Sequence, residues 1–240
     1  MNDDIAALFD FPSDHALSAL FRAAGHAHRL PGVIDRCLDG VDGPRIEGDC
    51  HPSVALEGAV VVSRGSHLGR NVTVEGPCYI GPGARISAGA HIRPGCWIGA
   101  NVQVGRGSEV KRAICLDDAK IASAAFVGDS ILGFGARVGS GAVFANRRFD
   151  QRDVTLRAED GTRHATGQPF FGAILGDYVR IGANAVLCPG IVVGAYSWIG
   201  PGVVLSANVP SARSVFVRQD LVMKPIAPRR LRRDAVPNPG

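Results

Sequence analysis

Arg93 and Lys111, eighteen residues apart, carry side chains that suit an anionic ligand. A guanidinium can form two parallel hydrogen bonds to a phosphate and an ammonium adds a mobile point charge, so the pair suits a phosphomonoester. His91 flanks the apolar Ile92 on the same predicted strand as Arg93, and alternation along a strand turns His91 and Arg93 outward onto one wall. Solvated surface residues would give the same pattern, so both interpretations stay open.

The histidines and cysteines of the chain do not form a metal-binding pattern. His26 and His28 lie two residues apart in a predicted helical segment, which places them on different sides of it. His51 and His67 are expected to be outward-facing residues without a ligand. The six cysteines include no C-x-x-C pair, which favours a reduced, cytoplasmic setting. We therefore expect no bound metal.

The elements that must position these residues follow from an aliphatic residue at every sixth position. A helix repeats every 3.6 residues and a strand every 2 residues, so neither explains this period. A period of six is typical of a β-solenoid, in which three short strands close a triangular coil of about 18 residues. The sequence therefore predicts an all-β fold, a single-stranded parallel β-helix of about seven coils. The repeated positions are Leu56, Val62, Leu68, Val74, Ile80, Ile86, Ile92, Ile98, Val104 and Val110, and again Leu175, Ile181, Leu187, Val193, Ile199 and Leu205.

The repeat is interrupted in the middle of the chain. The third residue after the aliphatic one is usually Gly or Asn, which tolerate a positive φ and so mark the corners of the coil. The repeat shortens to five residues before Cys115 and before Leu132, and such local distortions often lie beside functional sites. From residue 145 to residue 173 the repeat stops, which predicts a functional arm. A hairpin turning at Asp160-Gly161 and reaching a neighbouring subunit would fit this arm.

Three regions are expected along the chain: a helical N-terminal cap over residues 1–50, the β-helix over 51–220 with its arm at 145–173, and a basic tail over 221–240. Ser13 is the expected N-cap of a helix that ends near Ala24, and a second helical segment is expected at 33–38. This cap is expected to cover the first coil and protect its edge strands. The tail contains four arginines among prolines and is expected to be disordered and solvated. They are Arg229, Arg230, Arg232 and Arg233.

Composition narrows the function further. A formal charge of +4 is a mild basic bias that suits anionic metabolites. The chain has no zinc-finger spacing, helix-turn-helix pattern or aromatic RNA-binding motif, so we expect no nucleic-acid partner. It also has no basic segment followed by an apolar run at its start and no stretch of 18 apolar residues, so we expect a cytoplasmic protein without membrane contact.

Several motifs along the repeat together resemble one family of enzymes. They are Arg93-Pro94-Gly95, Ser108-Glu109-Val110-Lys111, Phe126-Val127-Gly128-Asp129, Ala145-Asn146-Arg147-Arg148-Phe149-Asp150 and Gly172-Ala173-Ile174-Leu175-Gly176-Asp177. Over about residues 55 to 220 the chain resembles the C-terminal acetyltransferase domain of GlmU-like bifunctional sugar-1-phosphate nucleotidylyltransferase/acetyltransferases, the archaeal form most of all. The resemblance implies a left-handed β-helix that assembles as a homotrimer and binds acetyl-coenzyme A in the grooves between subunits. No phosphate loop of the nucleotidylyltransferase domain is found in this sequence, so a separate chain is a possible source of that activity.

The resemblance also assigns roles to individual residues. It implies that Arg93 and Lys111 hold the sugar phosphate and that Asn146 positions the substrate amine. Arg218 corresponds to an arginine that contacts the coenzyme A phosphates. Two further coenzyme A contacts are expected at Ala183 and Pro201.

Three positions depart from the family pattern. The catalytic histidine, which would take a proton from the attacking amine, is replaced by Ser123. A serine without an adjacent base does not accept a proton near neutral pH. A tyrosine becomes Phe126 and an asparagine becomes Arg137, which adds positive charge and indicates a more acidic substrate. His164, on the arm, is the candidate substitute base, although an ordinary surface histidine is the simpler interpretation.

Three functional classes are therefore compared. The first is an acetyl-coenzyme A-dependent acyltransferase that acts on a phosphorylated or nucleotide-linked aminosugar, related to glucosamine-1-phosphate N-acetyltransferase. The second is a binding or scaffold protein that has lost catalysis with the histidine. The third is a zinc solenoid of the carbonic-anhydrase kind, which needs histidines on adjacent coils. His67 and His91 are twenty-four residues apart, more than one coil, so the third class is disfavoured.

Overall fold

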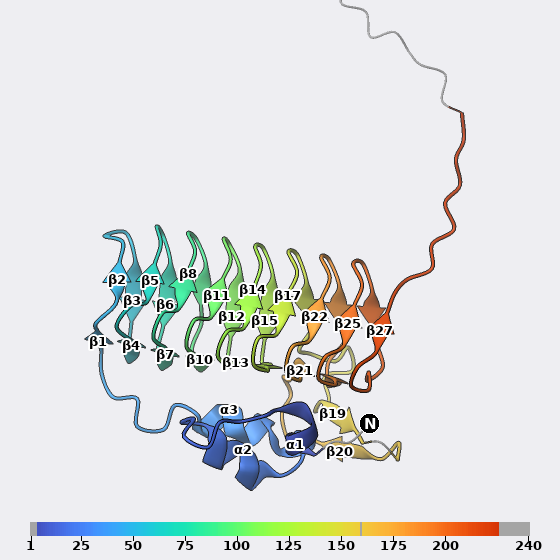
Figure 1. Ribbon diagram of the computed structural model, residues 1–240, viewed down its shortest axis with the longest axis horizontal. Helices are drawn as coiled ribbons and strands as arrows, with labels where there is room; N and C mark the ends of the chain where they lie inside the picture. Colours follow the sequence, from blue (N-terminus) through green and yellow to red (C-terminus); the bar gives the residue numbers. More distant parts are fainter. Residues whose placement is uncertain (1–3, 159, 226–240) are drawn as a thin grey trace, which may run out of the picture.

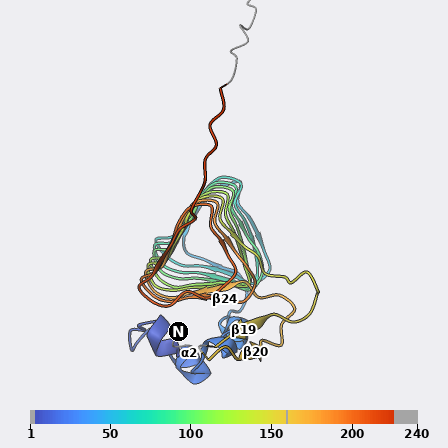
Figure 2. The ribbon, with the colours of Figure 1, turned by 90° about the vertical axis from the view of Figure 1, so that its right-hand side faces the viewer.

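The computed structural model describes residues 4–158 and 160–225, and most of them wind into a triangular solenoid with three flat walls (Figures 1 and 2). Each wall is a parallel sheet, and the walls follow one another along every coil. Among the described residues wall 1 has eight strands: β1 Arg45–Ile46, β4 Val60–Val62, β7 Cys78–Ile80, β10 Cys96–Ile98, β13 Ile114–Cys115, β16 Ile131–Leu132, β21 Ala173–Leu175 and β24 Ile191–Val193. Wall 2 has nine described strands: β2 Asp49–Cys50, β5 His67–Leu68, β8 Arg85–Ile86, β11 Gln103–Val104, β14 Lys120–Ile121, β17 Arg137–Val138, β22 Arg180–Ile181, β25 Trp198–Ile199 and β27 Ser214–Val215. Wall 3 has eight described strands: β3 Ala55–Glu57, β6 Thr73–Glu75, β9 His91–Ile92, β12 Glu109–Lys111, β15 Phe126–Gly128, β18 Val143–Phe144, β23 Val186–Leu187 and β26 Val204–Leu205.

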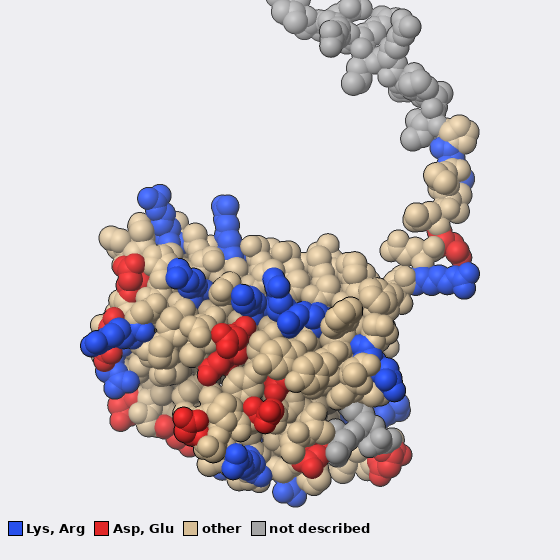
Figure 3. Space-filling model, in the orientation of Figure 1, with Lys and Arg blue, Asp and Glu red and all other residues tan. Residues whose placement is uncertain are grey.

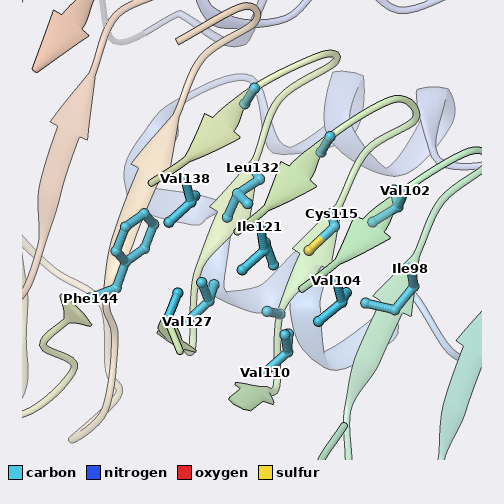
Figure 4. Packing of buried hydrophobic residues seen from close by; sticks show 14 of the residues in the cluster. Ile98, Val102, Val104, Val110, Cys115, Ile121, Val127, Leu132, Val138 and Phe144 are labelled. Atoms are coloured by element: carbon cyan, nitrogen blue, oxygen red, sulfur yellow. The ribbon is translucent and has the colours of Figure 1, made fainter. Parts of the chain in front are cut away.

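The sixth-residue aliphatic side chains point into the solenoid and stack from coil to coil, as the repeat predicts (Figure 4). In wall 1, Ile80 is in register with Ile98, which is in register with Cys115, and all three are fully buried. A buried side chain of this size contributes about 1.5–3 kcal/mol to folding. Because every coil repeats the contribution, the solenoid is a rigid support for what its walls carry on the outside.

The solenoid is longer than the roughly seven coils expected from the sequence, since the described sheets contain eight or nine strands each. The difference arises at both ends of the solenoid, and β27 follows Leu205, the last regular aliphatic position. Strands β1 and β2 precede the first regular aliphatic position at Leu56, and Arg45 and Ile46 of β1 are exposed. They pair by backbone hydrogen bonds without adding a full apolar step, so the aliphatic count does not detect them.

The corners of the coil carry residues with positive φ, many of them the predicted Gly and Asn, such as Asn101 (56°) and Gly107 (63°). The two shortened repeats make tighter corners between wall 3 and wall 1. There Arg112 and Asp129 adopt positive φ of 42° and 48°, although neither is glycine or asparagine. The interruption of the repeat therefore marks a change of backbone geometry at two neighbouring corners.

The N-terminal helices lie along the outside of wall 1 and do not cover the first coil, so the expected position of the cap is wrong (Figures 1 and 2). They are α1 Ile5–Leu8, α2 Ser18–Ala24, the 3-10 helix η1 Ala27–Arg29 and α3 Pro31–Arg36. Phe21 and Leu30 of this region share one buried cluster with the outward side chains Ile114, Ile131 and Ile174 of wall 1. Burial of these outward apolar side chains explains why the helices pack there.

The helix boundaries also differ from the sequence-based expectation. Helix α2 begins at Ser18 and its N-cap is Leu17, so Ser13 is not the N-cap. The imidazole of His15 accepts a hydrogen bond from the N–H of Leu17 and holds the preceding turn outside the helix. Helix α1 was not expected, and the carboxylate of Asp4 caps it by accepting the N–H of Ala6.

The arm leaves wall 3 after Phe144 and contains the expected hairpin, formed by β19 Thr155–Arg157 and β20 Arg163–Ala165. Val154 and Leu156 are buried in the same cluster as the N-terminal helices. The hairpin therefore packs on the helices of its own chain, where the sequence analysis expected a reach toward a neighbouring subunit. The four tail arginines lie outside the described residues.

Candidate functional site

The predicted site residues occupy two walls of the solenoid. Arg93, Lys111 and Phe126 face outward from wall 3, and Asn146 follows that wall where the arm begins. Arg137 lies on wall 2, and Ser123 lies at the exposed corner between wall 2 and wall 3. Within one chain, the predicted phosphate ligands and the position of the missing base therefore belong to different surfaces.

Asp129 gathers Lys111 and Asn146 at the shortened corner between wall 3 and wall 1. Its side chain is 2 % exposed, and its Oδ2 accepts a hydrogen bond from Asn146 Nδ2 at 2.6 Å. Lys111 Nζ lies 3.4 Å from the same oxygen, and Arg112 Nη1 lies 3.2 Å from Oδ1. The sequence analysis did not assign a role to this carboxylate, although the shortened repeat pointed to its position.

Phe170, on the return of the arm, covers the same cluster. Its ring lies 4.6 Å from Lys111 Nζ and 4.7 Å from the guanidinium carbon of Arg147, distances at which a cation is attracted to an aromatic face. Lys111 therefore already contacts a carboxylate and an aromatic ring. An anion that bound this ammonium would compete with both.

Two further side chains of wall 3 also contact carboxylates. Arg93 Nη1 donates to Glu109 Oε1 at 2.9 Å, and His91 Nε2 lies against Glu75 Oε1. Both pairs are partly exposed, so each contributes little to stability. The main effect of Glu109 is to neutralise the positive charge of Arg93.

Wall 2 is different, because it carries an open pocket of about 340 Å³ with an excess of positive charge. Ser123 and Arg137 line this pocket together with Arg85 and Lys120, and its floor contains the small residue Gly105. Among the residues that the structure describes, no Asp, Glu or His lines it. The pocket can bind an anion, and it offers no proton acceptor of its own.

The basic side chains of wall 2 are stacked on neighbouring strands. Lys120 is in register with Arg137, and Arg137 is in register with Arg180 on the next coil. Neighbouring strands lie about 4.8 Å apart, and like charges placed directly opposite destabilise a sheet. Burial and the charge of Arg137 lower the pKa of Arg180. Lys120 and Arg137 have no ion pair within the described part of the chain. Figure 3 shows Lys and Arg side chains on the exposed wall of the solenoid above the helices.

His164 is placed on another side of the molecule. Its ring stacks on that of His28 with centroids 4.3 Å apart and planes at 15°, beside the outward Val192 of wall 1. Among the described residues it does not line the pocket that contains Ser123. A role as the substitute base would therefore require the arm to move or a second subunit to bring its own arm.

The residues that the resemblance assigns to coenzyme A extend along the corner that carries Ser123. Backbone hydrogen bonds connect successive turns of this corner: the N–H of Gly141 donates to Ser123 O, and the N–H of Gly202 donates to Ala183 O. Ala183 and Pro201 are exposed there. Arg218 is exposed three residues beyond β27.

The described residues contain no group of three or more His, Cys, Asp or Glu arranged to hold a metal ion. None of the helices in 4–158 and 160–225 has the length and apolar character needed to cross a bilayer.

Comparison with known proteins finds one matching family and several relatives. The model of the GMPPB C-terminal domain family matches residues 74–193, which is half of the chain. A bifunctional sugar-1-phosphate nucleotidylyltransferase/acetyltransferase of Sulfurisphaera tokodaii is 37% identical over 101 residues, covering 42% of this chain and 25% of that protein. A bifunctional protein GlmU of Methanococcus aeolicus is 31% identical over 179 residues, covering 75% of this chain and 43% of that protein. The chain thus spans less than half the length of either relative.

A solved structure agrees on the architecture. The UDP-N-acetylglucosamine acyltransferase of Francisella novicida superposes with a TM-score of 0.53 at 14% identity, covering 73% of this chain and 66% of that one. At this identity the likeness shows the fold alone. The solenoid is a left-handed parallel β-helix, as the resemblance implied.

Proposed function

Because the chain belongs to the family of the GMPPB C-terminal domain, we propose that it transfers an acyl group from acetyl-coenzyme A to a phosphorylated or nucleotide-linked aminosugar. The pocket of wall 2 is the observation that carries this proposal. Arg137 and Lys120 present positive charge there without a carboxylate beside them. Ser123, which the resemblance aligns with the family base, lines the same pocket. The name of the Sulfurisphaera relative supports a sugar substrate and acyl transfer.

The reaction joins the acceptor amine to the acyl carbon. The amine nitrogen attacks the thioester carbonyl, the new N–C bond forms, the C–S bond breaks, and coenzyme A leaves as the thiol. The attacking amine must first lose a proton, and Ser123 cannot take it. Nearby positive charge disfavours an ammonium, so Arg137 and Lys120 lower the pKa of an amine bound between them, and its proton passes to solvent. Without a positioned base we expect a rate about 10² to 10⁴ lower than with one.

The remaining parts of the proposal concern assembly and setting. A homotrimer would place a second subunit against the pocket and complete the groove in which coenzyme A is expected beside Ala183, Pro201 and Arg218. The name of the Sulfurisphaera relative joins an acetyltransferase to a nucleotidylyltransferase, so a nucleotidylyltransferase is the proposed partner. We also propose a cytoplasmic setting, because all six cysteines are free thiols, as a reducing compartment would keep them.

Turnover with a substrate panel tests the proposal. Thiol release from acetyl-coenzyme A is followed with aminosugar phosphates and with nucleotide-linked aminosugars, and binding of each acceptor is measured by calorimetry. We expect release above the uncatalysed rate with at least one acceptor and a tenfold or greater loss of acceptor affinity in Arg137→Ala. The matched variant Arg36→Ala removes an exposed arginine from α3, on the side of wall 1, and should behave as wild type. Absence of both thiol release and binding would refute the proposal.

The second candidate function is a binding or scaffold protein that holds the anionic sugar without reacting it. One observation favours it: in the described structure the pocket around Ser123 contains no imidazole or carboxylate. Calorimetric binding of an acceptor without any thiol release would select this function over the first.

A further inference from the structure

The outward column of wall 2 changes from basic to aromatic toward the C-terminal end of the solenoid. Arg180 of β22 is in register with Trp198 of β25, whose side chain is 59% exposed. Tyr178 and Tyr196 stack on each other beside this position, with ring centroids 5.3 Å apart. Phe216, 65% exposed, follows β27, the strand in register with β25. Exposed aromatic rings therefore adjoin the stacked cations.

The guanidinium groups nearest to these rings, those of Arg180 and Arg137, have no negatively charged partner among the described residues. Arg180 Nη1 donates to the backbone oxygen of Gly135 at 2.6 Å, which fixes the guanidinium close to Arg137. In the described chain neither Arg137 nor Arg180 has a carboxylate partner. The burial and like charge that lower the pKa of Arg180 would both be offset by a bound anion. Two adjacent guanidiniums suit two adjacent phosphate groups.

We propose that the strip Trp198, Arg180, Arg137 and Lys120 binds a nucleoside diphosphate. The base stacks on Trp198, the two phosphates lie at Arg180 and Arg137, and the group carried by the second phosphate reaches Lys120 and Ser123. Aromatic side chains bind bases of any sequence because every base has a stacking face. The carried group is the acceptor sugar if the proposed acyl transfer is correct, so this step rests on the proposed function and narrows its substrate to a nucleotide-linked sugar.

The dimensions of the strip favour a nucleotide-linked acceptor over coenzyme A as its occupant. From Trp198 to Lys120 the strip crosses three strand spacings, about 14 Å at about 4.8 Å each. Base, ribose and two phosphates fill such a length and leave the attached sugar at Ser123. Coenzyme A also contains a nucleoside diphosphate, but its long pantetheine arm would carry the thioester beyond Ser123.

Tryptophan fluorescence and calorimetry test the strip directly. The chain has two tryptophans, and Trp97 is stacked against Tyr79 on wall 1, away from the strip. Wild type, Trp198→Phe and Trp198→Ala are titrated with UDP, GDP, glucose 1-phosphate and coenzyme A. We expect UDP or GDP to quench the wild-type emission and not that of Trp198→Phe, which retains only Trp97. We expect the affinity for that nucleotide to fall about tenfold or more in Trp198→Ala and to be retained in Trp198→Phe.

Substitution of single arginines distinguishes specific phosphate contacts from a general electrostatic attraction of the anion. Arg137→Ala should weaken nucleotide binding about tenfold or more, and Arg36→Ala, on α3, should leave it unchanged. Glucose 1-phosphate, which lacks a base, should bind at least tenfold more weakly than the better nucleotide. Equal loss in both arginine variants, quenching by coenzyme A alone, or no quenching by UDP and GDP would each overturn the proposal.

The thiol-release assay distinguishes a failure of nucleotide binding at the strip from a failure of acyl transfer. Nucleotide binding at Trp198 without thiol release would support the strip and refute acyl transfer. Thiol release with a sugar monophosphate, in a protein that binds neither UDP nor GDP, would support acyl transfer and refute the strip.

Discussion

Replacing Asp177 with asparagine should remove the loss of stability that the wild-type protein shows between about pH 4 and pH 6. Asp177 lies where the segment after α1 meets the corner between wall 1 and wall 2, and it is 3% exposed. Its Oδ2 accepts the N–H of Asp10 and its Oδ1 accepts the N–H of Phe134, both at 2.8 Å. Burial outweighs these hydrogen bonds and raises the pKa of Asp177 from 3.8 to about 6, and the charge of Asp10 adds to the rise.

The magnitude follows from the difference in proton binding. Between about pH 4 and pH 6 the folded chain keeps a proton on Asp177 that the unfolded chain has released, so the free energy of unfolding decreases as the pH rises through this window. A pKa difference of about two corresponds to about 3 kcal/mol. This contribution is fully present below pH 4 and lost above pH 6.

An asparagine does not ionise, but its NH2 group cannot accept one of the two N–H hydrogen bonds, and this loss costs about 1–3 kcal/mol at every pH. We therefore expect the stability of Asp177→Asn relative to wild type to be up to about 3 kcal/mol higher at pH 7.5 than near pH 4. Urea unfolding followed by far-UV circular dichroism at both pH values measures the difference. Asp118→Asn, on an exposed corner where φ is 61°, controls for the loss of one negative charge. An equal destabilisation by Asp177→Asn at both pH values would refute the reasoning, because the hydrogen bonds of the carboxylate would then outweigh its burial.

Three further predictions use other parts of the structure. Ser123→His should raise thiol release with an aminosugar phosphate at least tenfold, because it restores an imidazole to the pocket of wall 2; an unchanged rate would show that the pocket is not the reaction site. Asp129→Ala should lower the free energy of unfolding by about 3 kcal/mol, because it leaves Lys111 and Arg112 without their buried carboxylate, whereas Glu109→Gln at the exposed Arg93 pair should cost less than about 1 kcal/mol in the same urea titration. Ellman's reagent should label at most Cys50 and Cys188 in the folded protein, because the other four cysteines are buried and burial raises the pKa of Cys37 and Cys96 to about 12; rapid reaction of all six would contradict the packing.

The solenoid could be predicted because every hexapeptide repeats the same residue types. Each aliphatic side chain must point inward and each corner residue must tolerate its φ, so the repeat can be recognised in one sequence without an alignment. The position of the helices could not be predicted from that period alone. A second signal was present: wall 1 strands such as Ala173-Ile174-Leu175 and Ile191-Val192-Val193 are apolar on both faces, which is typical of a covered sheet.

The candidate site was predictable in part. The shortened repeats located the corner of Asp129, but its partners depend on the folded arm, which brings Phe170 back over Lys111. The pocket of wall 2 collects residues spaced about one coil apart, Lys120 and Arg137 among them. Writing the sequence in rows of one coil would have aligned these cations with Arg180 and Trp198. The contribution of a second subunit has no such signal within one chain.

The packing of the N-terminal helices on wall 1 imposes an order on biosynthesis. Helices α2 and α3 are complete by Arg36, but the wall that covers them extends to Val192 of β24. At a synthesis rate of about 5–20 residues per second, their apolar faces wait about ten seconds or longer for that wall. During this interval Phe21 and Leu30 lack part of the wall that buries them in the folded chain.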